Sequence, residues 1–596
     1  MKTFKKLYFL LNIHQRKRAG LLLMMILFMG ILDMIGVASV MPFMAVLTNP
    51  NLIETNIILK YMYQTSSIFG VKNNQQFLFI LGILLFFILI FTLAFKAIVT
   101  YVQLRFLLML EHTIGKRLVE GYLHQPYSWF LNRHSADFGK TILSESGKIA
   151  GRGIGNFMDL VTKIVLTVAI TILLIIVDPK LALIIGATLG ISYIVIFFSV
   201  NTYLKRIGDE SLKNNELRFT AVTEAFSAVK EIKIGGLEQI YIKNFSNSSR
   251  IFALTQASAS ITAQLPRFFL ESLGFGGVLL IILYSMAKEG SFSSALPIVS
   301  LYVFAGYRLL PALQMIYSSF TQLVFISSSL DKLHDDLKSL TPPKENQDKG
   351  VLFFNKKISL KNIHYKYPNS SRRALDNISL SIPLNSTIGL IGATGCGKTT
   401  LVDIIMGLLE PQKGSLEVDD KIITKQNLRS WQRLIGYVPQ HIYLSDDTVA
   451  ANIAFGVELK DVDQESIEKV SKTANLHEFV IEELPKQYET KIGERGIRLS
   501  GGQRQRIGIA RALYHRPKVL ILDEATSALD NKTEKLVMDA LNTFSKDITT
   551  VIIAHRLSTV INCDKIFILE KGKLKNEGTF QELININENF RIKGNN

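Results

Sequence analysis

A chain of 596 residues is too long to fold around a single core, so at least two domains are expected. Hydrophobic residues make up 48% of the chain and its mean hydropathy is +0.25, which is high for a soluble protein and indicates membrane segments. The formal charge of +17 fits cationic cytoplasmic loops of a membrane protein better than nucleic-acid binding, and two cysteines exclude a disulfide framework and fit a reducing cytoplasm.

The N-terminal half contains long, almost uncharged stretches. After a short basic and apolar start, which could lie along a membrane surface, residues 19–47 exceed the roughly 20 apolar residues that cross a bilayer. The length of this stretch and the absence of a small-residue cleavage site argue against a signal peptide, so a retained span is expected. Five further spans are predicted at residues 77–101, 157–177, 181–200, 265–286 and 295–315.

The connections between these spans suggest how the chain is oriented. Residues 102–156 and 201–264 are rich in Lys, Arg and Glu and keep helical spacing, which predicts cytoplasmic extensions of the spans and a cytoplasmic N-terminus. Residues 178–180 allow only a tight hairpin between the third and fourth spans. Outside the membrane, residues 52–69 predict a short amphipathic helix with Ile53, Ile57, Ile58, Tyr61 and Met62 on one side.

Four ionisable residues lie in or near the spans, where charge is costly and often functional: Lys96, Arg267, Glu271 and Arg308. All four are expected toward the cytoplasmic side. They could extend to the membrane surface, with Arg267 and Glu271 pairing along one helix. Alternatively, the three cations line a cavity and receive an anionic head group, for which a phosphate-bearing lipid would be suitable.

The pattern changes after the last span. The polar run 331–348 predicts an exposed linker, and strands alternate with helices from residue 351 onward. We therefore expect an all-α six-helix transmembrane domain over residues 1–335, a linker over 336–350 and an α/β domain over 351–596.

The stretch 392–400 matches the phosphate-loop pattern G-x-x-x-x-G-K-[ST], between a predicted strand at 387–391 and a helical pattern at 401–406. Glycines there let backbone amides face phosphate oxygens, and the helix adds the positive end of its dipole. Lys398 is expected to reach the β- and γ-phosphates, and the Thr399 hydroxyl to bind Mg²⁺. The loop residues predicted to bind the nucleotide are Gly392, Thr394, Gly395, Cys396, Gly397, Lys398, Thr399 and Thr400, with Cys396 as a filler rather than a nucleophile.

Two further motifs follow the loop. Residues 519–524 read as an apolar strand ending in Asp523, which can hold the water shell of Mg²⁺, and Glu524, which can polarise a water for attack on the γ-phosphate. Residues 499–513 read as a helix that begins with Ser and Gly, and its N-terminus is a second anion site. One domain with one phosphate loop does not need this second site, whereas two facing chains would.

A set of motifs, in this order along the chain, resembles the ATPase domain of ABC transporters. The motifs lie at residues 392–400, Gln440, 499–503, 523–524, 527–530 and His555. The resemblance spans roughly residues 357–574. The six predicted spans with long cytoplasmic connections are similar to the exporter half-transporters of that family, so the resemblance covers nearly the whole chain.

The resemblance implies roles for single residues. Tyr367 would stack on adenine, Gln440 would contact Mg²⁺ and sense the membrane domain, and His555 would hold the γ-phosphate and the attacking water. Glu494 would touch the cytoplasmic helices of a partner chain. The residues that would close over ATP bound to a second copy of the chain are Ser500, Gly501, Gly502 and Gln503. No required position is degenerate, so both sites of a homodimer are expected to hydrolyse ATP with Mg²⁺.

Within the exporters, the chain resembles lipid-linked oligosaccharide flippases of the bacterial protein N-glycosylation type. The resemblance lies in residues 40–43, 266–271 and 307–311 and in the outer helix. This implies transfer of a polyprenyl-pyrophosphate glycan across a bacterial inner membrane, with Lys96, Arg267 and Arg308 binding its pyrophosphate and sugar end. The alternatives are a multidrug or general lipid exporter with a more apolar cavity, and an ATP-gated channel or regulatory membrane protein. A soluble ATPase acting on DNA or ribosomes is opposed by the six spans, so no nucleic-acid partner is expected.

Overall fold

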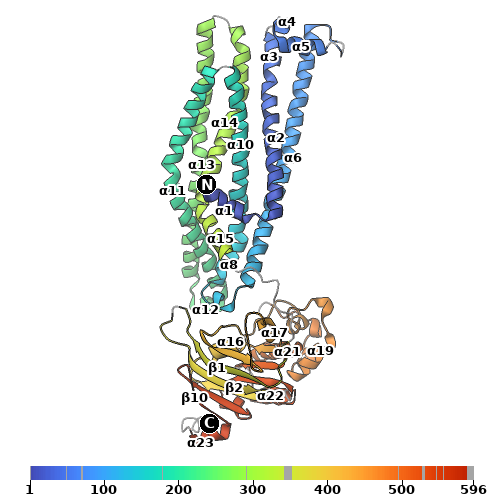
Figure 1. Cartoon of the computed structure of the whole chain (residues 1–596), viewed down its shortest axis with the longest axis vertical. Helices are drawn as coiled ribbons and strands as arrows, with labels where there is room; N and C mark the ends of the chain where they lie inside the picture. Colours follow the sequence, from blue (N-terminus) through green and yellow to red (C-terminus); the bar gives the residue numbers. More distant parts are fainter. Residues whose placement is uncertain are drawn as a thin grey trace. The chain divides into compact units, whose positions relative to one another are not determined.

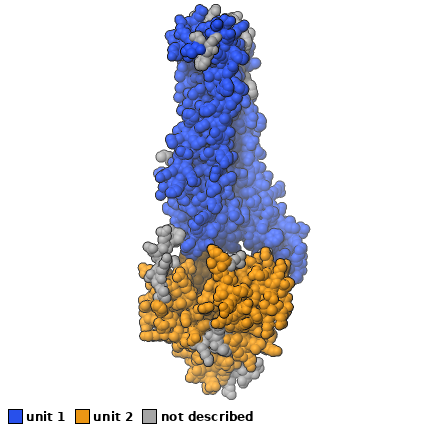
Figure 2. Space-filling model, turned by 90° about the vertical axis from the view of Figure 1, so that its right-hand side faces the viewer, with its two compact units in different colours: residues 1–125, 132–343 blue, residues 126–131, 344–596 orange. Residues whose placement is uncertain are grey.

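The chain forms two compact units in the computed structural model (Figure 2): unit 1 comprises Met1–Gln125 and Asn132–Pro343, and unit 2 comprises Pro126–Leu131 and Lys344–Asn596. Each unit is described separately. The residues that the structure describes are 2–48, 50, 52–66, 68, 71–177, 179–289, 292–340, 352–368, 370–493, 496–525, 530–544, 547–554 and 556–586.

Unit 1 is helical, and its long helices run side by side (Figure 1). Each predicted span lies in a helix: the first in α2 and α3, which meet at Ser39, and the others in α6, α10, α11, α13 and α14. The bounds are α1 (Lys2–Leu10), α2 (Ile13–Ala38), α3 (Val40–Thr48), α4 (Leu52–Thr55), α5 (Ile57–Ser66), α6 (Asn74–Leu123), α8 (Ser135–Lys140), two π-helices (Thr141–Glu145 and Ile149–Gly155) around α9 (Ser146–Lys148), α10 (Asn156–Val177), α11 (Pro179–Ser227), α12 (Val229–Gly235), α13 (Glu238–Glu289), α14 (Phe292–Phe325) and α15 (Ser327–Ser339).

Several of these helices are long and apolar enough to cross a membrane. Among the described residues there are four by length and composition, or five if the bent pair Leu301–Phe325 and Ser327–Ser339 counts as one span. The predicted span 265–286 lies in α13, where many side chains fall outside the described part. Helices α6, α11 and α13 contain 50, 49 and 52 residues. Each is about 75 Å long, well over the roughly 30 Å hydrocarbon core, so the predicted helical extensions are present.

The prediction of one amphipathic helix over residues 52–69 was wrong. The segment contains two short helices, α4 and α5, because the Asn56 side chain accepts hydrogen bonds from two backbone amides of α5 and so starts a new helix. The predicted apolar face is also divided. Ile53 is buried, whereas Ile57, Ile58 and Tyr61 are exposed.

The predicted exposed linker over residues 331–348 begins too early. Helix α15 continues to Ser339 and buries Leu330 and Leu333. Asp336 in the same helix accepts a hydrogen bond from Arg133 at 3.3 Å. The polar appearance of this stretch therefore conceals an apolar face with helical spacing, and residues 341–348 lie outside the described part.

A ring of four charges joins α8, α11 and α15 in unit 1. The fully buried Lys140 ammonium lies 2.6 Å from Asp137 and 2.8 Å from Glu216, and Lys332 lies 3.0 Å and 3.1 Å from the same two carboxylates. Burial alone would raise the pKa of Glu216, but the two ammonium groups hold it below its ordinary value. The ring thus fixes three helix segments to one another.

Unit 2 has two sheets and surrounding helices (Figure 1), as the predicted α/β domain requires. The antiparallel sheet has the order β2-β1-β4-β5, and the larger sheet has the order β10-β9-β3-β8-β7-β6, parallel except for β10. The strands are β1 (Lys357–Tyr365), β2 (Leu375–Pro383), β3 (Thr387–Gly392), β4 (Lys413–Val418), β5 (Lys421–Ile422), β6 (Ile435–Val438), β7 (Val519–Asp523), β8 (Thr549–Ile553), β9 (Lys565–Glu570) and β10 (Lys573–Gly578). The helices are α7 (Tyr127–Phe130), α16 (Lys398–Ile405), α17 (Leu428–Gln432), α18 (Val449–Ile453), α19 (Gln464–Thr473), α20 (His477–Glu482), α21 (Gly501–Tyr514), α22 (Asn531–Phe544) and α23 (Phe580–Ile586).

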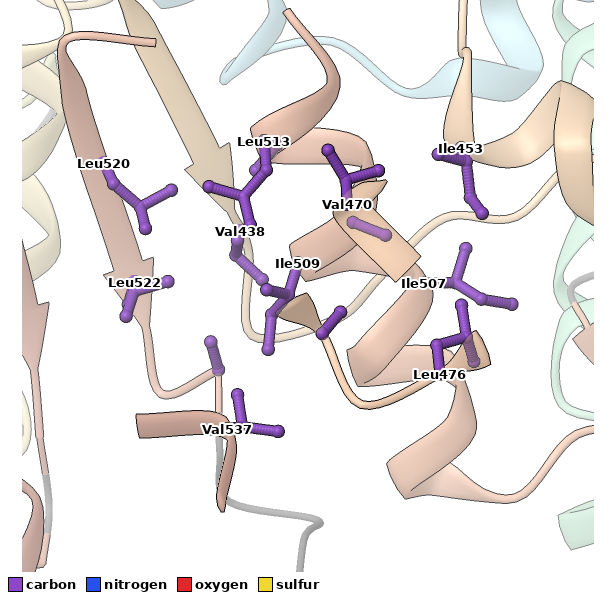
Figure 3. Close-up of a cluster of buried hydrophobic side chains, with 14 of the residues drawn as sticks. Val438, Ile453, Val470, Leu476, Ile507, Ile509, Leu513, Leu520, Leu522 and Val537 are labelled. Atoms are coloured by element: carbon purple, nitrogen blue, oxygen red, sulfur yellow. The ribbon is translucent and has the colours of Figure 1, made fainter. Parts of the chain in front are cut away.

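The core of unit 2 holds the strands that carry the predicted motifs. Apolar side chains of β6 and β7 face those of α21 (Figure 3), among them Val438, Leu520, Leu522, Ile509 and Leu513. All residues of β7 are buried, as expected for a strand inside a parallel sheet. This packing fixes α21 relative to the end of β7, where two of the predicted site residues lie.

Candidate functional site

The loop 392–400 joins β3 to α16, as predicted. Gly397 has φ +109°, and a Cβ there would lie 2.7 Å from the carbonyl oxygen of Ala374, so only glycine fits. The Lys398 ammonium donates to the loop carbonyls of Gly392 at 2.8 Å and Ala393 at 3.3 Å. Lys398 is thus held inside the curve of the loop, where it can neutralise phosphate charge.

The hydroxyls beside Lys398 differ in their surroundings. Thr399 is exposed and available to a metal ion, whereas Thr400 is buried and its hydroxyl lies 3.0 Å from that of Tyr367. Tyr367 packs edge-on against Tyr365, with ring centroids 5.1 Å apart. The predicted adenine-stacking residue is therefore next to the predicted phosphate loop, while Thr394 and Gly395 are exposed at its tip.

Asp523 ends β7 beside two partners that sequence reasoning missed. The Tyr437 hydroxyl donates to Asp523 at 3.4 Å. Asp403, on α16, is buried, and its burial, together with the charge of Asp523, raises its pKa to about 6. No local pattern marks Asp403 or Tyr437, because both reach Asp523 only through the packing of α16 and β6 against β7.

Glu524 is held by contacts at both its side chain and its backbone. Its carboxylate accepts a hydrogen bond from the Gln440 amide at 2.7 Å, which joins two residues predicted separately. Its backbone has φ +51°, a conformation that costs a non-glycine residue of order 1 kcal/mol and often occurs at functional sites. Gln505, on α21, donates to the Glu524 carbonyl at 3.4 Å, a further contact that sequence reasoning missed.

Ser500 starts α21 with a complete capping box. Its hydroxyl accepts from the Gln503 amide at 3.2 Å, and the Gln503 side chain accepts from the Ser500 amide at 2.8 Å. Gly501 and Gly502 form the first helical turn, so the predicted second anion site is a well-formed helix N-terminus.

A segment from the N-terminal half also belongs to unit 2. Pro126–Leu131 contains helix α7 and folds with unit 2 rather than with the helices on either side of it in the chain. Burial, the Asp403 carboxylate and Tyr367 raise the pKa of Tyr127, which therefore lies near two residues of the site. Sequence reasoning did not find Tyr127.

The donor atoms around the loop fit a hard cation. Thr399, Gln440 and Asp523 offer a hydroxyl, an amide oxygen and a carboxylate, the oxygen ligands that Mg²⁺ uses together with phosphate oxygens. Among the described residues no group of three or more His, Cys, Asp or Glu converges on one point. His555, Glu494 and residues 527–529 lie outside the described residues, so their predicted roles have no structural account.

The predicted membrane charges separate into two groups. Arg267 bonds Glu271 on its own helix at 2.6 Å, the pairing that the sequence spacing allowed. Arg308 instead lies 3.3 Å from Asp33 on α2, a buried acid that sequence reasoning missed. Lys96 lies within electrostatic range of Lys163, a second cation that sequence reasoning missed.

Comparisons with known proteins match both halves of the chain. Residues 375–527 match a family model described as "ABC transporter", and residues 39–307 match one described as "ABC transporter transmembrane region". The chain is 30% identical over 485 residues to the heterocyst differentiation ATP-binding protein HepA of Nostoc sp., covering 80% of this chain and 77% of the relative. It is 31% identical over 480 residues to an ATP-dependent lipid A-core flippase of Cupriavidus metallidurans, covering 79% of each.

The fold is also similar to that of a solved structure. A bacterial Atm1-family ABC exporter with ATP bound superposes with a TM-score of 0.78 at 19% sequence identity, covering 98% of each chain. At that level of identity the likeness concerns the fold, and it extends over both units.

Proposed function

The chain belongs to the ABC transporter family and couples ATP hydrolysis to transport, and on that premise we propose that it flips a lipid-linked oligosaccharide across a bacterial inner membrane as a homodimer. The observation that supports a lipid substrate with a charged head is the set of cations within the spans, Lys96 and Arg308 foremost. A relative named lipid A-core flippase supports a lipid as the class of substrate.

The Mg²⁺-dependent reaction is assigned to residues of unit 2. Lys398 and the amides of residues 392–400 would hold the phosphates, and Thr399, Gln440 and Asp523 would hold the metal ion, which neutralises developing phosphate charge when bound. Glu524 would orient and deprotonate the attacking water, and the Gln440 amide fixes the orientation of its carboxylate. We assign His555 to the γ-phosphate by the family motif alone.

Two features support a second copy of the chain. The helix N-terminus at Ser500 offers phosphate contacts that one loop does not require. In unit 1, apolar side chains are exposed around α12, with Phe226 75% exposed and Ile234 89% exposed, although this end of the helices is expected in the cytoplasm. We assign this surface to the α/β unit of the second copy.

The substrate assignment is tested by transport. Proteoliposomes that hold the full chain and a labelled polyprenyl-pyrophosphate glycan are given ATP, and the label is probed from outside. ATP-dependent protection of the label is expected, and its loss is expected in Glu524→Gln proteoliposomes. No protection with the wild-type chain would contradict the proposed substrate.

The second candidate is a multidrug or general lipid exporter. An apolar pocket of about 400 Å³ between α3 and α6, lined by Phe43, Phe79 and Phe86, favours it. In that case Arg308→Ala would leave drug-stimulated ATP turnover intact, whereas the proposed function expects the same substitution to abolish stimulation by the polyprenyl-pyrophosphate glycan.

A further inference from the structure

Five ionisable side chains lie on four helices of unit 1, with α10 packed against α2 and α14 and α2 packed against α6. Lys163 on α10 lies within electrostatic range of Lys96 on α6, Asp33 on α2, Asp159 on α10 and Arg308 on α14. Asp33 approaches Arg308 to 3.3 Å. We call Lys96, Lys163 and Arg308 the cation cluster.

The cation cluster carries an excess of positive charge. Three cations face two carboxylates, and one of these, Asp159, already accepts a hydrogen bond from Gln103 at 2.7 Å. Asp33 is then the carboxylate that pairs directly with the cluster. Unbalanced charge within a membrane is costly and is relieved when an anion binds.

The ion pair between Asp33 and Arg308 is incomplete. Asp33 is 3% exposed, and its Oδ1 lies 3.3 Å from the Arg308 guanidinium. That same oxygen makes no hydrogen bond within the part of the chain that the structure describes. A charge pair without a well-aligned hydrogen bond lacks much of the strength of a charge-assisted contact, so another anion can compete for Arg308.

We propose that the cation cluster binds the phosphate groups of an anionic ligand, that Lys163 is one of the binding residues, and that Asp33 is an internal counter-ion that competes with the phosphate. The inference rests on the proposed function, because it names the contacts of the same head group. It also changes the predicted set: Lys163 joins Lys96 and Arg308, whereas Arg267 is engaged by Glu271.

The proposal makes opposite predictions for the two signs of charge. Neutralising Lys163 or Arg308 removes an attraction for phosphate and weakens binding. Neutralising Asp33 removes both a repulsion and a competitor, so it tightens binding. A purely structural ion pair would weaken binding when either partner is removed.

The experiment measures binding of labelled polyprenyl diphosphate to the full chain in phosphatidylcholine nanodiscs without ATP. Lys163→Gln and Arg308→Gln are expected to raise the Kd roughly tenfold, and Asp33→Asn to lower it several-fold. Arg105→Gln is the matched control, since Arg105 is an exposed cation on α6 and its loss should leave the Kd unchanged.

A double variant keeps the test decisive if Asp33→Asn alone folds poorly. Asp33→Asn/Arg308→Gln leaves no unpaired Arg308, and it is expected to bind several-fold more tightly than Arg308→Gln, because the repulsion from Asp33 is gone. Equal or weaker binding by the double variant would overturn the role of Asp33. An unchanged Kd for Lys163→Gln would overturn the cluster itself.

Inorganic pyrophosphate separates the two sources of phosphate. If it displaces the label only at far higher concentration, the ligand is a lipid head group, and if it competes equally, the cluster recognises free phosphate. Both outcomes support the cluster, and the second contradicts the lipid substrate proposed above. Conversely, wild-type transport of the glycan with no effect of any cluster variant on binding would overturn the cluster and leave the proposed function standing.

Discussion

The two acidic residues at the end of β7, Asp523 and Glu524, are held by contacts with neighbouring residues. Glu524 is turned by its left-handed backbone and held by Gln440, while Asp523 shares its surroundings with the buried Asp403. Two neighbouring carboxyls thus experience different environments. One accepts a hydrogen bond from Gln440, and the other adjoins a buried acid whose pKa is raised to about 6.

Glu524→Gln tests the role of that first carboxyl. The amide keeps the size and can still bond Gln440, but it cannot accept a proton, so ATP turnover should fall by about 10²-fold or more with nucleotide binding retained. Phosphate release and binding of a fluorescent ATP analogue measure the two effects. Glu410→Gln, at a side chain 75% exposed, is the control that should keep full turnover. Undiminished turnover in Glu524→Gln would contradict the assignment.

Asp403→Asn tests the electrostatics at the metal side. The folded-state pKa of about 6 exceeds the ordinary 3.8, so the folded state holds the proton more tightly and stability falls as pH rises from about 4 to 6. Asparagine removes this penalty, and the variant should be more stable than wild type by about 1–2 kcal/mol at pH 8 and no more stable at pH 4. Unfolding of the full chain in EDTA at the two pH values measures this. Equal differences at both pH values would exclude ionisation as the cause.

Whether a site residue could be predicted from the sequence depends on how far its partners lie from it along the chain. Gly392, Lys398 and Asp523 lie in contiguous motifs, and their places at the end of β3, the start of α16 and the end of β7 were predictable. Asp403 and Gln505 could not be found, because their partners become neighbours only when helices pack on the sheet. Asp33 is one acid in an apolar run, so the sequence alone does not distinguish it. Its ion pair with Arg308 forms only when α2 and α14 pack together.

At the scale of elements, helix ends and helix junctions carry the specific polar contacts. The capping box begins α21, and the charge ring joins α8, α11 and α15. Helical spacing predicted α21 and the extension that contains α11 in outline, whereas most of α15 was expected to be linker. It could not predict the break at Asn56 or the packing of α15, because both depend on side-chain contacts that helical spacing does not encode.

Ser500 variants separate helix capping from nucleotide contact. Ser500→Ala loses the cap and should cost about 0.5–2 kcal/mol of stability. Ser500→Asp keeps a good cap but adds negative charge where a phosphate of the second copy is proposed, so stability should be retained and ATP turnover lost. Thermal unfolding and phosphate release distinguish the two variants. Normal turnover in Ser500→Asp would argue against phosphate at this helix end.

Lys140→Ala tests the charge ring. Its removal leaves Asp137 and Glu216 to share Lys332, and the variant should lose about 1–3 kcal/mol of stability because two charge-assisted contacts are lost and the two carboxylates then repel each other over one ammonium group. Lys116→Ala is the control, since the Lys116–Glu120 pair is exposed and should change stability by less than about 0.5 kcal/mol. Similar unfolding temperatures for both variants would show that the ring is not stabilising.

At the scale of the whole molecule, each catalytic site is proposed to take its phosphate loop from one copy and its capped helix from the other. A mixed dimer tests this. One copy carries Lys398→Ala and the other Ser500→Asp, so both lesions fall in the same site and the second site keeps an intact loop and helix. Purified by two different tags, the mixed dimer should hydrolyse ATP, whereas the dimers of either variant alone should not. An inactive mixed dimer would contradict a shared site.

Helix α7 has a consequence for how this protein can be taken apart. Pro126–Leu131 folds with the α/β unit, although it interrupts the helical half of the chain. A fragment that starts at Lys344 would keep both sheets and every buried residue of the two core clusters of unit 2. Because α7 has no buried residues, the fragment is expected to fold without it. Such a fragment would lack Tyr127, so Asp403 and Tyr367 would be more open to water in it than in the full chain.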